Sequence, residues 1–368
     1  MPWVRRTRHL ALRACEDDDP RVIVRSLLAG KQTELSVSEL EALLRLPIRS
    51  WTWLAEDDPW AEELGRAGLV VSDDPEEPFA GLRRRDEELT ALGWWPDAAA
   101  LHLGARWDGA RARVPGRDGS PAAARSYQGL PLPAFPIRGG SRVSLPRSEA
   151  ESLLRQVLAR RRTVRAFENT PPVDLTELAT LLRWVWGAHG TTRLAGDDVG
   201  LRRTSPGGGA LHPIEVYPVV MRVEGLSPGV YHYLGGDHAL ELVAALDEGS
   251  ARTLVEDAAA GQWYFAESAV AFVMTARFRR SFRKYQFHPK IYRAVFLDAG
   301  HLSQTFYLLC TELGLGPWVT AALDEGILER ALGLEPLDEG VIAVCGCGRP
   351  AVSSGGPLQP VFVPLDPG

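Results

Sequence analysis

The stretch "RRTSPGGGALHPIEVYPVV", residues 202–220, joins a glycine-rich loop directly to an apolar, β-branched segment. Glycine loses more backbone freedom on folding than other residues, so the three consecutive glycines Gly207–Gly209 are costly to order. The β-branched and aromatic residues that follow predict a strand. A bare backbone next to a strand indicates a loop that a flat ring can approach closely. The alternative interpretation, a flexible turn before a strand, stays open on these residues alone.

Around this loop the sequence predicts strands and helices that interleave. Short β-branched or aromatic segments bounded by turn residues predict strands at 215–223, 229–234, 238–243, 269–277 and 340–348. Apolar residues at helical spacing predict helices at 153–158, 174–185, 249–261, 291–314 and 326–334. The order does not follow a strict βαβ repeat. We therefore expect an α+β domain in which a mixed sheet packs against helices.

The N-terminal part has a different pattern. Segments 35–47 and 61–68 predict two helices, and "LVVS" at 69–72 predicts a short strand. Helix, helix and short strand are typical of a small winged-helix-like module, and the acidic residues around it favour peptide binding or scaffolding. Residues 106–146 are rich in Gly, Pro, Arg and Ser, as in a linker or wrapping arm. The expected organisation is a module at 1–105, a linker at 106–146 and a main domain at 147–368.

Composition limits the classes of function. The 368 residues are 45% hydrophobic and 24% charged, as in ordinary globular proteins. The formal net charge of −6 argues against nucleic acid as the main partner, because phosphate binding needs a basic field. No apolar run reaches the length of a membrane span, and the N-terminus lacks the apolar core of a signal peptide. We expect no membrane association and a cytoplasmic location.

The cysteines do not predict a metal site. Cys345 and Cys347 alternate on a predicted strand, but no further Cys or His joins them at a suitable spacing. A closed zinc site needs four ligands. The eight histidines include no H-E-x-x-H pair. We expect both cysteines to be small core residues, which is the usual behaviour of free cysteine.

A basic segment, "RRRTVRAF" at 160–167, follows the first predicted helix of the main domain. In an extended chain Arg161, Thr163 and Arg165 project to one side, because alternate residues share a face. Two guanidinium groups and a hydroxyl are suited to a phosphate or a carbonyl-rich ring edge. The alternative is a solvated basic helix end that interacts with the helix dipole.

A second candidate for chemistry is the pair Lys284–Tyr285, between the strand 269–277 and the helix 291–314. A lysine beside a tyrosine can transfer protons where a partly buried pocket shifts their pKa values towards neutrality. The sequence contains no P-loop, no G-x-G-x-x-G between a strand and a helix, and no G-x-S-x-G. A kinase, a Rossmann dehydrogenase and a serine hydrolase are therefore not expected.

Taken together and in this order, these segments resemble the nitroreductase superfamily. Within it they resemble the SagB-type dehydrogenases of peptide maturation, which include azoline oxidases. The resemblance covers about residues 146–350 and rests on "RRTVRAF", "RRTSPGGGALHPIEVY", "SPGVYHYL", "RKYQFHPKIYRAVFLDAGHLSQTFYLLCTELGLG" and "GVIAVCGCGRP". Two features depart from the usual pattern: Gly207 stands where the family loop has a serine, and "QFHPK" follows the Lys-Tyr pair.

The resemblance implies a homodimer that binds FMN at the subunit interface. The arginine segment would hold the flavin phosphate and ring edge, and the glycine loop would lie along the isoalloxazine. After the last strand, Arg349 would reach the phosphate. The implied FMN-binding residues are Arg161, Arg162, Thr163, Arg165, Pro206, Gly207, Gly208, Gly209, Leu211 and Arg349.

The resemblance also implies the reaction. An azoline in a ribosomal peptide would lose a hydride to flavin N5 while Lys284 or Tyr285 assists proton removal, and dioxygen would reoxidise the flavin. The partners would be a precursor peptide and cyclodehydratase proteins. The N-terminal module could bind a leader peptide by strand addition, or could only stabilise a dimer. The alternatives are another desaturation of a peptide side chain, an NAD(P)H-dependent nitroreductase, and a non-catalytic peptide-binding subunit.

Overall fold

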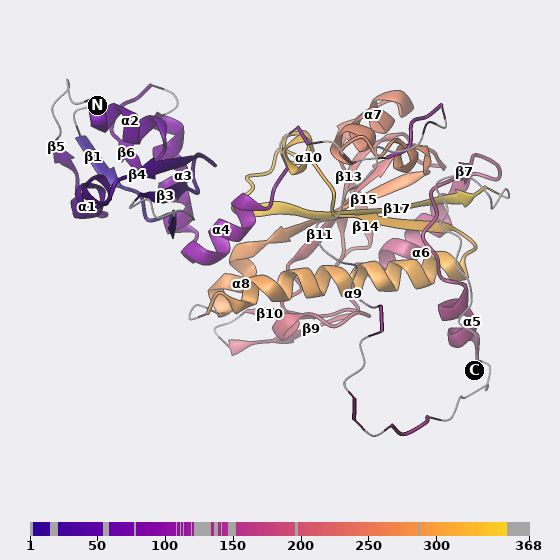
Figure 1. Cartoon of the computed structure of the whole chain (residues 1–368). Helices are drawn as coiled ribbons and strands as arrows, with labels where there is room; N and C mark the ends of the chain where they lie inside the picture. Colours follow the sequence, from indigo (N-terminus) through magenta and orange to yellow (C-terminus); the bar gives the residue numbers. More distant parts are fainter. Residues whose placement is uncertain are drawn as a thin grey trace.

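A computed structural model gives the fold (Figure 1). It describes residues 3–14, 21–53, 59–76, 79–107, 152–195, 198–285 and 288–351. Between 107 and 152 it describes only 109–110, 112, 114–118, 120, 134–135, 139–140 and 142–145, so most of the predicted linker lies outside the described residues. No helix in the described ranges is long and apolar enough to cross a membrane.

The main domain is built on a seven-stranded sheet with the order β14-β13-β11-β15-β17-β16, in which β7 also pairs with β17. The strands are β7 (Phe167–Glu168), β11 (Ile214–Val220), β13 (Gly229–Leu234), β14 (Ala239–Ala245), β15 (Val270–Arg277), β16 (Gly316–Thr320) and β17 (Glu339–Pro350). The strands predicted from the sequence are present, and the α+β class is confirmed. Neighbouring strands of this sheet pair antiparallel. Parallel pairing is found between β8 (Val173–Asp174) and β12 (Val223–Glu224).

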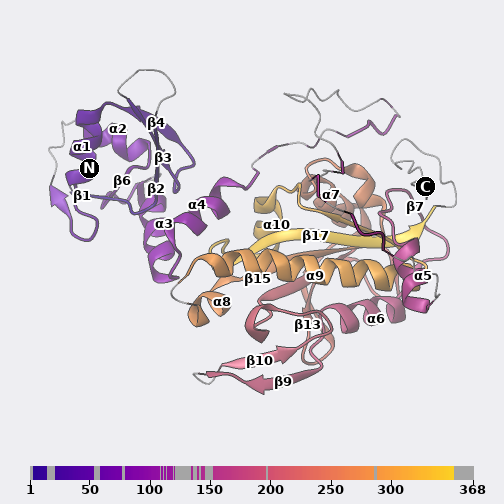
Figure 2. The same cartoon turned by 60° about the horizontal axis from the view of Figure 1, so that its bottom comes forward.

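Helices cover both faces of the sheet (Figures 1 and 2). Helices α6 (Leu175–Val185) and α9 (Lys290–Glu312) cover one face, and α7 (Glu248–Ala258) and α10 (Glu325–Leu332) cover the other. Alternate residues of a strand point to opposite faces. Phe272 and Met274 of β15 therefore pack on the α9 side, and Ala271 and Val273 pack on the α7 side.

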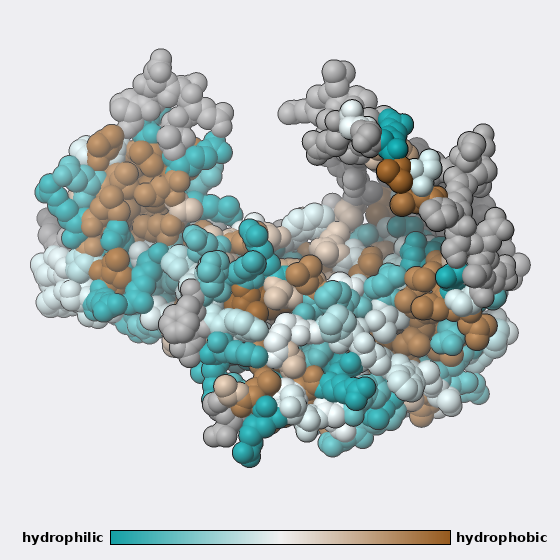
Figure 3. Space-filling view, turned by 90° about the horizontal axis from the view of Figure 1, so that it is seen from below, coloured by the Kyte–Doolittle hydropathy of each residue, from teal (hydrophilic) through white to brown (hydrophobic). Residues whose placement is uncertain are grey.

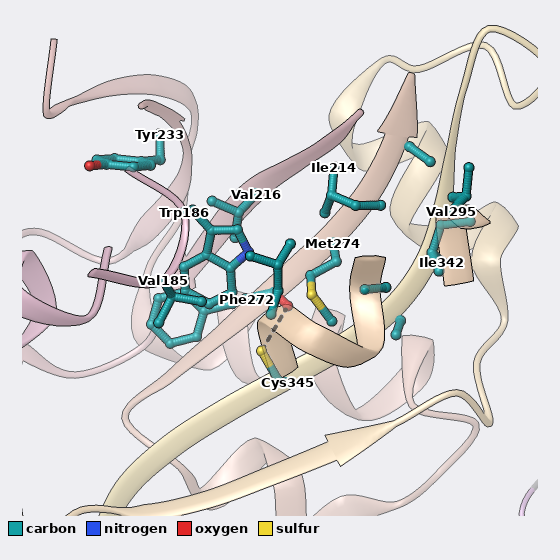
Figure 4. Packing of buried hydrophobic residues seen from close by; sticks show 14 of the residues in the cluster. Val185, Trp186, Ile214, Val216, Tyr233, Phe272, Met274, Val295, Ile342 and Cys345 are labelled. Carbon is teal, nitrogen blue, oxygen red and sulfur yellow. Dashed lines mark hydrogen bonds between the residues drawn. The ribbon is translucent and has the colours of Figure 1, made fainter. Parts of the chain in front are cut away.

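The α9 side of the core is aromatic and sulfur-rich (Figure 4). The Trp186 ring stacks on Phe272, with ring centroids 5.1 Å apart. Cys345 and Cys347 are fully buried in the same cluster. The expectation that these two cysteines are core residues is confirmed.

Three helices matter for the site, and a local sequence signal explains the start of the first, α6. Asp174 caps α6 by accepting the Glu177 N–H, and the Glu177 carboxylate accepts the Asp174 N–H, which completes a capping box. Helix α9 has 23 residues and buries one continuous face. A short helix, α8 (Phe278–Lys284), precedes it and buries Phe278, Ser281 and Phe282. The sequence did not predict α8, because seven residues are too few to establish a helical period.

The N-terminal module contains two small sheets and four helices within its described residues. The predicted helices correspond to α1 (Val37–Arg45) and α2 (Pro59–Arg66), and the predicted strand to β6 (Val70–Ser72). The other elements are β1 (Trp3–Arg6), β2 (Leu10–Ala14), β3 (Val22–Ser26), β4 (Gln32–Leu35), β5 (Thr52–Trp53), α3 (Phe79–Ala91) and α4 (Pro96–Gly104). The sheet β2-β3-β4 was not predicted.

Helix α4 and the turn before it attach the module to the main domain. The Trp94 indole N–H donates to the Leu337 carbonyl at 2.9 Å. Buried His102 forms a 3.1 Å hydrogen bond with the Tyr292 hydroxyl at the start of α9. Burial lowers the pKa of His102 to about 3, so the imidazole is neutral at this junction. The module therefore shares a core with the domain that carries the predicted site.

Candidate active site

The glycine loop is fixed to α9. Its three residues Gly208–Ala210 form a 3-10 turn, in which Gly209 has φ 64° and ψ 24°. The Gly208 N–H donates to both oxygens of Asp298, at 3.0 and 3.2 Å. Two residues before the glycines, the Ser205 hydroxyl lies 2.7 Å from the Thr305 hydroxyl. The loop is therefore held by side chains of α9, while its own glycines leave a bare backbone.

Asp298 is the anchor that the sequence reasoning missed. Its side chain is almost fully buried, with 5% of the residue exposed. Burial raises the pKa of Asp298, while the Gly208 N–H and the nearby His301 and Arg203 favour the ionised carboxylate. The sequence signal was present in the "DAGH" motif at 298–301, but the motif does not say which backbone N–H the carboxylate binds.

The structure gives a reason for the glycine at position 207. A Cβ added to Gly207 would lie 2.6 Å from Nδ1 of His212, so the imidazole occupies the space of a side chain. His212 is buried, and its φ of 47° lies in the left-handed region. Burial, followed by the charge of Arg203, lowers the pKa of His212 to about 4. A neutral imidazole therefore packs against the loop.

The Lys-Tyr pair reaches the same loop. Lys284 ends α8, and its Nζ donates to the Gly209 carbonyl at 2.9 Å. The Nζ also lies 5.5 Å from the centroid of the Tyr285 ring. A Cβ at Gly209 would meet the Tyr285 hydroxyl and would lie 2.8 Å from Lys284 Nζ. The amine and the phenol thus occupy the space that the missing side chain of Gly209 leaves open.

Residues 161–166 of the arginine segment form no regular helix or strand, and the segment contacts α9 at Tyr307. The Thr163 hydroxyl lies 3.1 Å from the Tyr307 hydroxyl, and Arg161 Cζ lies 5.6 Å from the centroid of the Tyr307 ring. Burial raises the pKa of Tyr307, while the hydrogen bond with Thr163 and the charges of Arg161 and Arg165 lower it. The sequence reasoning did not identify Tyr307. Arg162, which was named as a candidate FMN-binding residue, is exposed, whereas Arg161 and Thr163 are half-buried.

Two predicted residues have other contacts. The Arg349 guanidinium donates to a Glu177 oxygen at 2.7 Å and to the carbonyls of Pro171 and Pro172 at 3.2 and 3.1 Å. The Arg349 side chain therefore forms these hydrogen bonds with α6 and the turn before it, and not with the arginine segment. The Leu211 side chain is fully buried, and its carbonyl accepts Arg280 Nε at 2.6 Å. Leu211 supports the end of the glycine loop from the protein interior.

The glycine loop and the arginine segment lie on opposite faces of α9. Asp298 and Tyr307 are nine residues apart, which on a helix of 3.6 residues per turn is a rotation of about 180° and a rise of about 13 Å. Helix α8, whose Lys284 binds the glycine loop, lies at one end of α9, and α5 (Leu153–Arg160), which leads into the arginine segment, lies at the other (Figure 2). One chain therefore presents two separate half-sites.

Exposed apolar residues lie on the two helices that flank the half-sites, α9 and α5. On α9, Phe296 and Leu297 are 44% and 62% exposed, and nothing lies within 4 Å of the Cβ position of Gly300. On α5, Leu153 and Leu154 are 82% and 60% exposed. Viewed from below Figure 1, the surface carries scattered hydrophobic residues on the main domain and a hydrophobic patch on the N-terminal module (Figure 3).

Known proteins share this architecture. The Nitroreductase family model matches residues 158–349, which is just over half of the chain. The nitroreductase-family protein MJ1384 of Methanocaldococcus jannaschii is 35% identical over 193 residues, which cover 52% of this chain and 90% of that protein. The trifolitoxin-processing protein TfxB of Rhizobium leguminosarum bv. trifolii is 30% identical over 172 residues, covering 46% of each chain.

One solved structure resembles the fold over most of its length. A chain of the E. coli microcin synthetase McbBCD complex with truncated pro-MccB17 bound aligns with a TM-score of 0.51. The two chains are 21% identical, and the alignment covers 71% of this chain and 96% of the other. At this level of identity the similarity concerns the fold alone.

Proposed function

This chain belongs to the nitroreductase family, and we propose that it is an FMN-dependent dehydrogenase that matures a ribosomal peptide. The substrate would be an azoline ring, which the enzyme oxidises to the aromatic azole with dioxygen as the final electron acceptor. The observation that carries the proposal is the Lys284 amine at 2.9 Å from the Gly209 carbonyl, beside Tyr285 and a loop without side chains.

The residues of both half-sites fit FMN. The bare backbone of Gly207–Gly209 offers a flat ring a surface without side chains. Arg161, Thr163 and Arg165 offer two guanidinium groups and a hydroxyl, which suit a phosphate. Arg162 and Arg349 contribute less to this proposal. Arg162 is exposed, and Arg349 is paired with Glu177.

The separation of the half-sites supports a homodimer. A helix is about 10 Å across with its side chains, so α9 stands between the arginine segment and the glycine loop of the same chain. One ligand can meet both sets only if a second copy brings its own loop to the arginine segment. The exposed apolar residues Phe296, Leu297 and Leu153 provide a surface for that contact. A twofold dimer would then contain two composite sites.

The chain's own residues supply proton handling and orientation. When bound, FMN supplies the two-electron redox chemistry, which no side chain here can perform. Conversion of an azoline to an azole removes two hydrogens from the ring, one of them as a proton. The neutral amine of Lys284 or the phenolate of Tyr285 would accept that proton at the edge of the glycine loop. Asp298 keeps the loop in place during this step through its hydrogen bonds to Gly208.

The relatives support a peptide substrate. TfxB is named for trifolitoxin processing, and the microcin synthetase was solved with a truncated pro-peptide. We extend this to a precursor peptide and cyclodehydratase partners for the present chain. Residues 1–105 would form the peptide-docking module, joined by residues 106–146 to the flavin-binding domain 147–368. The module exposes Leu12, Val37 and Leu44, which suits an amphipathic peptide.

The first test of this proposal is the cofactor. The purified protein is expected to be yellow and to release about one FMN per subunit, as one pre-formed site per chain predicts. A colourless protein that cannot be reconstituted with FMN would favour a peptide-binding subunit. Rapid flavin reduction by NADPH without peptide turnover would favour a nitroreductase. Fragmentation mass spectrometry of the product would distinguish an azole from a desaturated side chain.

The second test is Lys284→Ala. Loss of a positioned proton acceptor typically lowers turnover by about 100-fold or more, whereas FMN should remain bound. A synthetic thiazoline peptide serves as substrate, and formation of the thiazole is followed by absorbance and mass. The matched control is Lys31→Ala, because Lys31 Nζ also donates to a backbone carbonyl, at 3.1 Å, but in the N-terminal module. Wild-type turnover by Lys284→Ala would remove this lysine from the mechanism.

A further inference from the structure

A strongly basic segment surrounds the proposed catalytic pair. Residues 277–293, "RFRRSFRKYQFHPKIYR", contain seven Lys or Arg residues and no Asp or Glu, in a chain of net charge −6. Only Lys284 of these seven takes part in the proposed reaction. The local charge is therefore opposite in sign to that of the whole protein, and the proposed chemistry does not require it.

Four of these arginines line one cavity. A cavity of about 590 Å³ lies between helix α8 and the α3–α4 turn of the N-terminal module, and Arg277, Arg279, Arg280 and Arg283 contribute to its wall. Trp95 and Phe282 form an aromatic part of the same wall, with ring centroids 4.9 Å apart. The cavity thus lies where the module meets the domain that carries the flavin site.

The arginines of the cavity differ in their pairing. Arg277 pairs with Glu215 at 3.2 Å, and Arg283 pairs with Asp198 at 3.4 Å. Arg280 instead donates to two backbone carbonyls, those of Leu211 and Val199, both at 2.6 Å.

Arg279 and Arg280 differ from the other two arginines in having no carboxylate partner among the described residues. In the described part of the chain, no carboxylate lies within ion-pair distance of Arg279 or Arg280. Burial and the charge of Arg277 lower the pKa of Arg280, while Glu215 and Asp198, which pair with other arginines, raise it. Arg279 is exposed. Two positive charges therefore remain available to a ligand.

The cavity adjoins the proposed reaction centre. Arg280 binds the carbonyl of Leu211 at one end of the glycine loop, and Lys284 binds the carbonyl of Gly209 within it. The two residues are four positions apart on α8, a distance of about 6 Å along a helix. A ligand held by Arg279 and Arg280 would lie beside a peptide ring presented to Lys284.

We infer that this cavity binds acidic side chains of the substrate peptide, next to the residue that is oxidised. The inference rests on the proposed function, because it takes a precursor peptide as the occupant. Arginine binds carboxylates through paired N–H groups, and Trp95 and Phe282 would pack against the peptide. The cavity therefore selects peptides that carry Asp or Glu near the oxidised ring.

The negative groups of the cavity favour a peptide over a nucleic acid. Asp198, Asp338 and Glu339 also line it. A phosphate backbone offers these carboxylates no hydrogen-bond donor, whereas a peptide backbone offers N–H groups between its acidic side chains. The Glu339 carboxylate already accepts the hydroxyls of Tyr217 and Thr275, at 3.0 and 2.6 Å, which leaves Asp338 as the exposed acceptor.

The test measures binding rather than turnover. A fluorescein-labelled peptide of alternating Glu and Gly, about ten residues long, is titrated with the flavin-loaded protein and followed by anisotropy at low salt. Arg279→Glu should weaken binding by tenfold or more, and Arg279→Gln by a smaller factor. The matched control Arg330→Glu makes the same charge change on an exposed residue of α10 and should change binding less than twofold.

Three outcomes would overturn the inference. Equal binding by wild type and Arg279→Glu would exclude the cavity, and equal binding of a peptide with Gln in place of Glu would exclude charge recognition. Tighter, Arg279-dependent binding of a single-stranded oligonucleotide would assign the site to nucleic acid. The flavin content of each sample is read from its visible spectrum. Acidic-peptide binding by a protein that holds no flavin would contradict the proposed function but not the basic site.

Discussion

The two faces of helix α9 present different kinds of binding surface. On the Asp298 face the glycine loop offers backbone, and the helix holds it with a buried carboxylate and the Thr305 hydroxyl. On the Tyr307 face the arginine segment offers charged side chains, and Arg161 and Thr163 contact the Tyr307 phenol. One surface is suited to a flat ring and the other to an anion. Under the proposed function, a ligand with both parts would need both faces and therefore a second copy of the chain.

This contrast predicts that the loop face is the more sensitive to a single substitution. Asp298→Ala would leave the half-buried Gly208 N–H without its carboxylate acceptor, at a cost of up to about 1–3 kcal/mol. The loop should shift, and FMN affinity should fall by tenfold or more when measured by quenching of flavin fluorescence. Asp298→Asn keeps an acceptor oxygen and should recover most of the affinity.

The comparator for Asp298→Ala on the other face is Tyr307→Phe. It removes one hydroxyl contact to Thr163 and leaves the arginines and the ring in place. Its effect on FMN affinity should be smaller. If Tyr307→Phe weakened FMN binding more than Asp298→Ala, the distinction between the two faces would be wrong.

A smaller effect should follow from a change at Gly209. Gly209→Ala places a side chain at φ 64°, where a non-glycine residue costs roughly 1–2 kcal/mol. The new Cβ would also displace Lys284 and Tyr285. Turnover of a thiazoline peptide should therefore fall about tenfold. This loss is smaller than in Lys284→Ala, because the proton acceptor is displaced but not removed.

Gly333→Ala is the control that separates the backbone cost of a positive φ from the steric contact with Lys284 and Tyr285. Gly333 has φ 67°, but nothing lies within 4 Å of its Cβ position at the end of α10. Both variants should lose similar stability in denaturant titrations, and only Gly209→Ala should lose turnover. Equal turnover in the two variants would mean that the contact with the Lys-Tyr pair has no role.

The sequence predicted what local patterns determine. The capping residues Asp174 and Glu177 gave the start of α6, and β-branched runs gave the central strands. Alternation predicted that Thr163 and its arginine neighbours share one side of an extended segment. The glycine loop and the Lys-Tyr pair were each visible as motifs. All of these depend on residues that are close in the chain.

Long-range contacts could not be predicted. The Asp298 anchor joins residues 90 positions apart, and Arg349 meets Glu177 across 172 positions. Helix α8 is fixed by the packing of Phe278 and Phe282 around Trp94, a residue of the N-terminal module. The opposite orientation of the half-sites depends on which segments pack on each face of α9, and these segments are far apart in the chain. Periodicity gives the face of each helix but not its neighbours.

The most direct test of the composite site is to mix two inactive variants. Arg161→Ala impairs the arginine half-site, and Lys284→Ala impairs the loop half-site. If each site combines one half from each subunit, a mixed dimer contains one intact site, and a statistical mixture should regain about a quarter of wild-type turnover. The account predicts this recovery after co-expression or joint refolding. Turnover no higher than that of the separate variants would contradict it and would confine the site to a single chain.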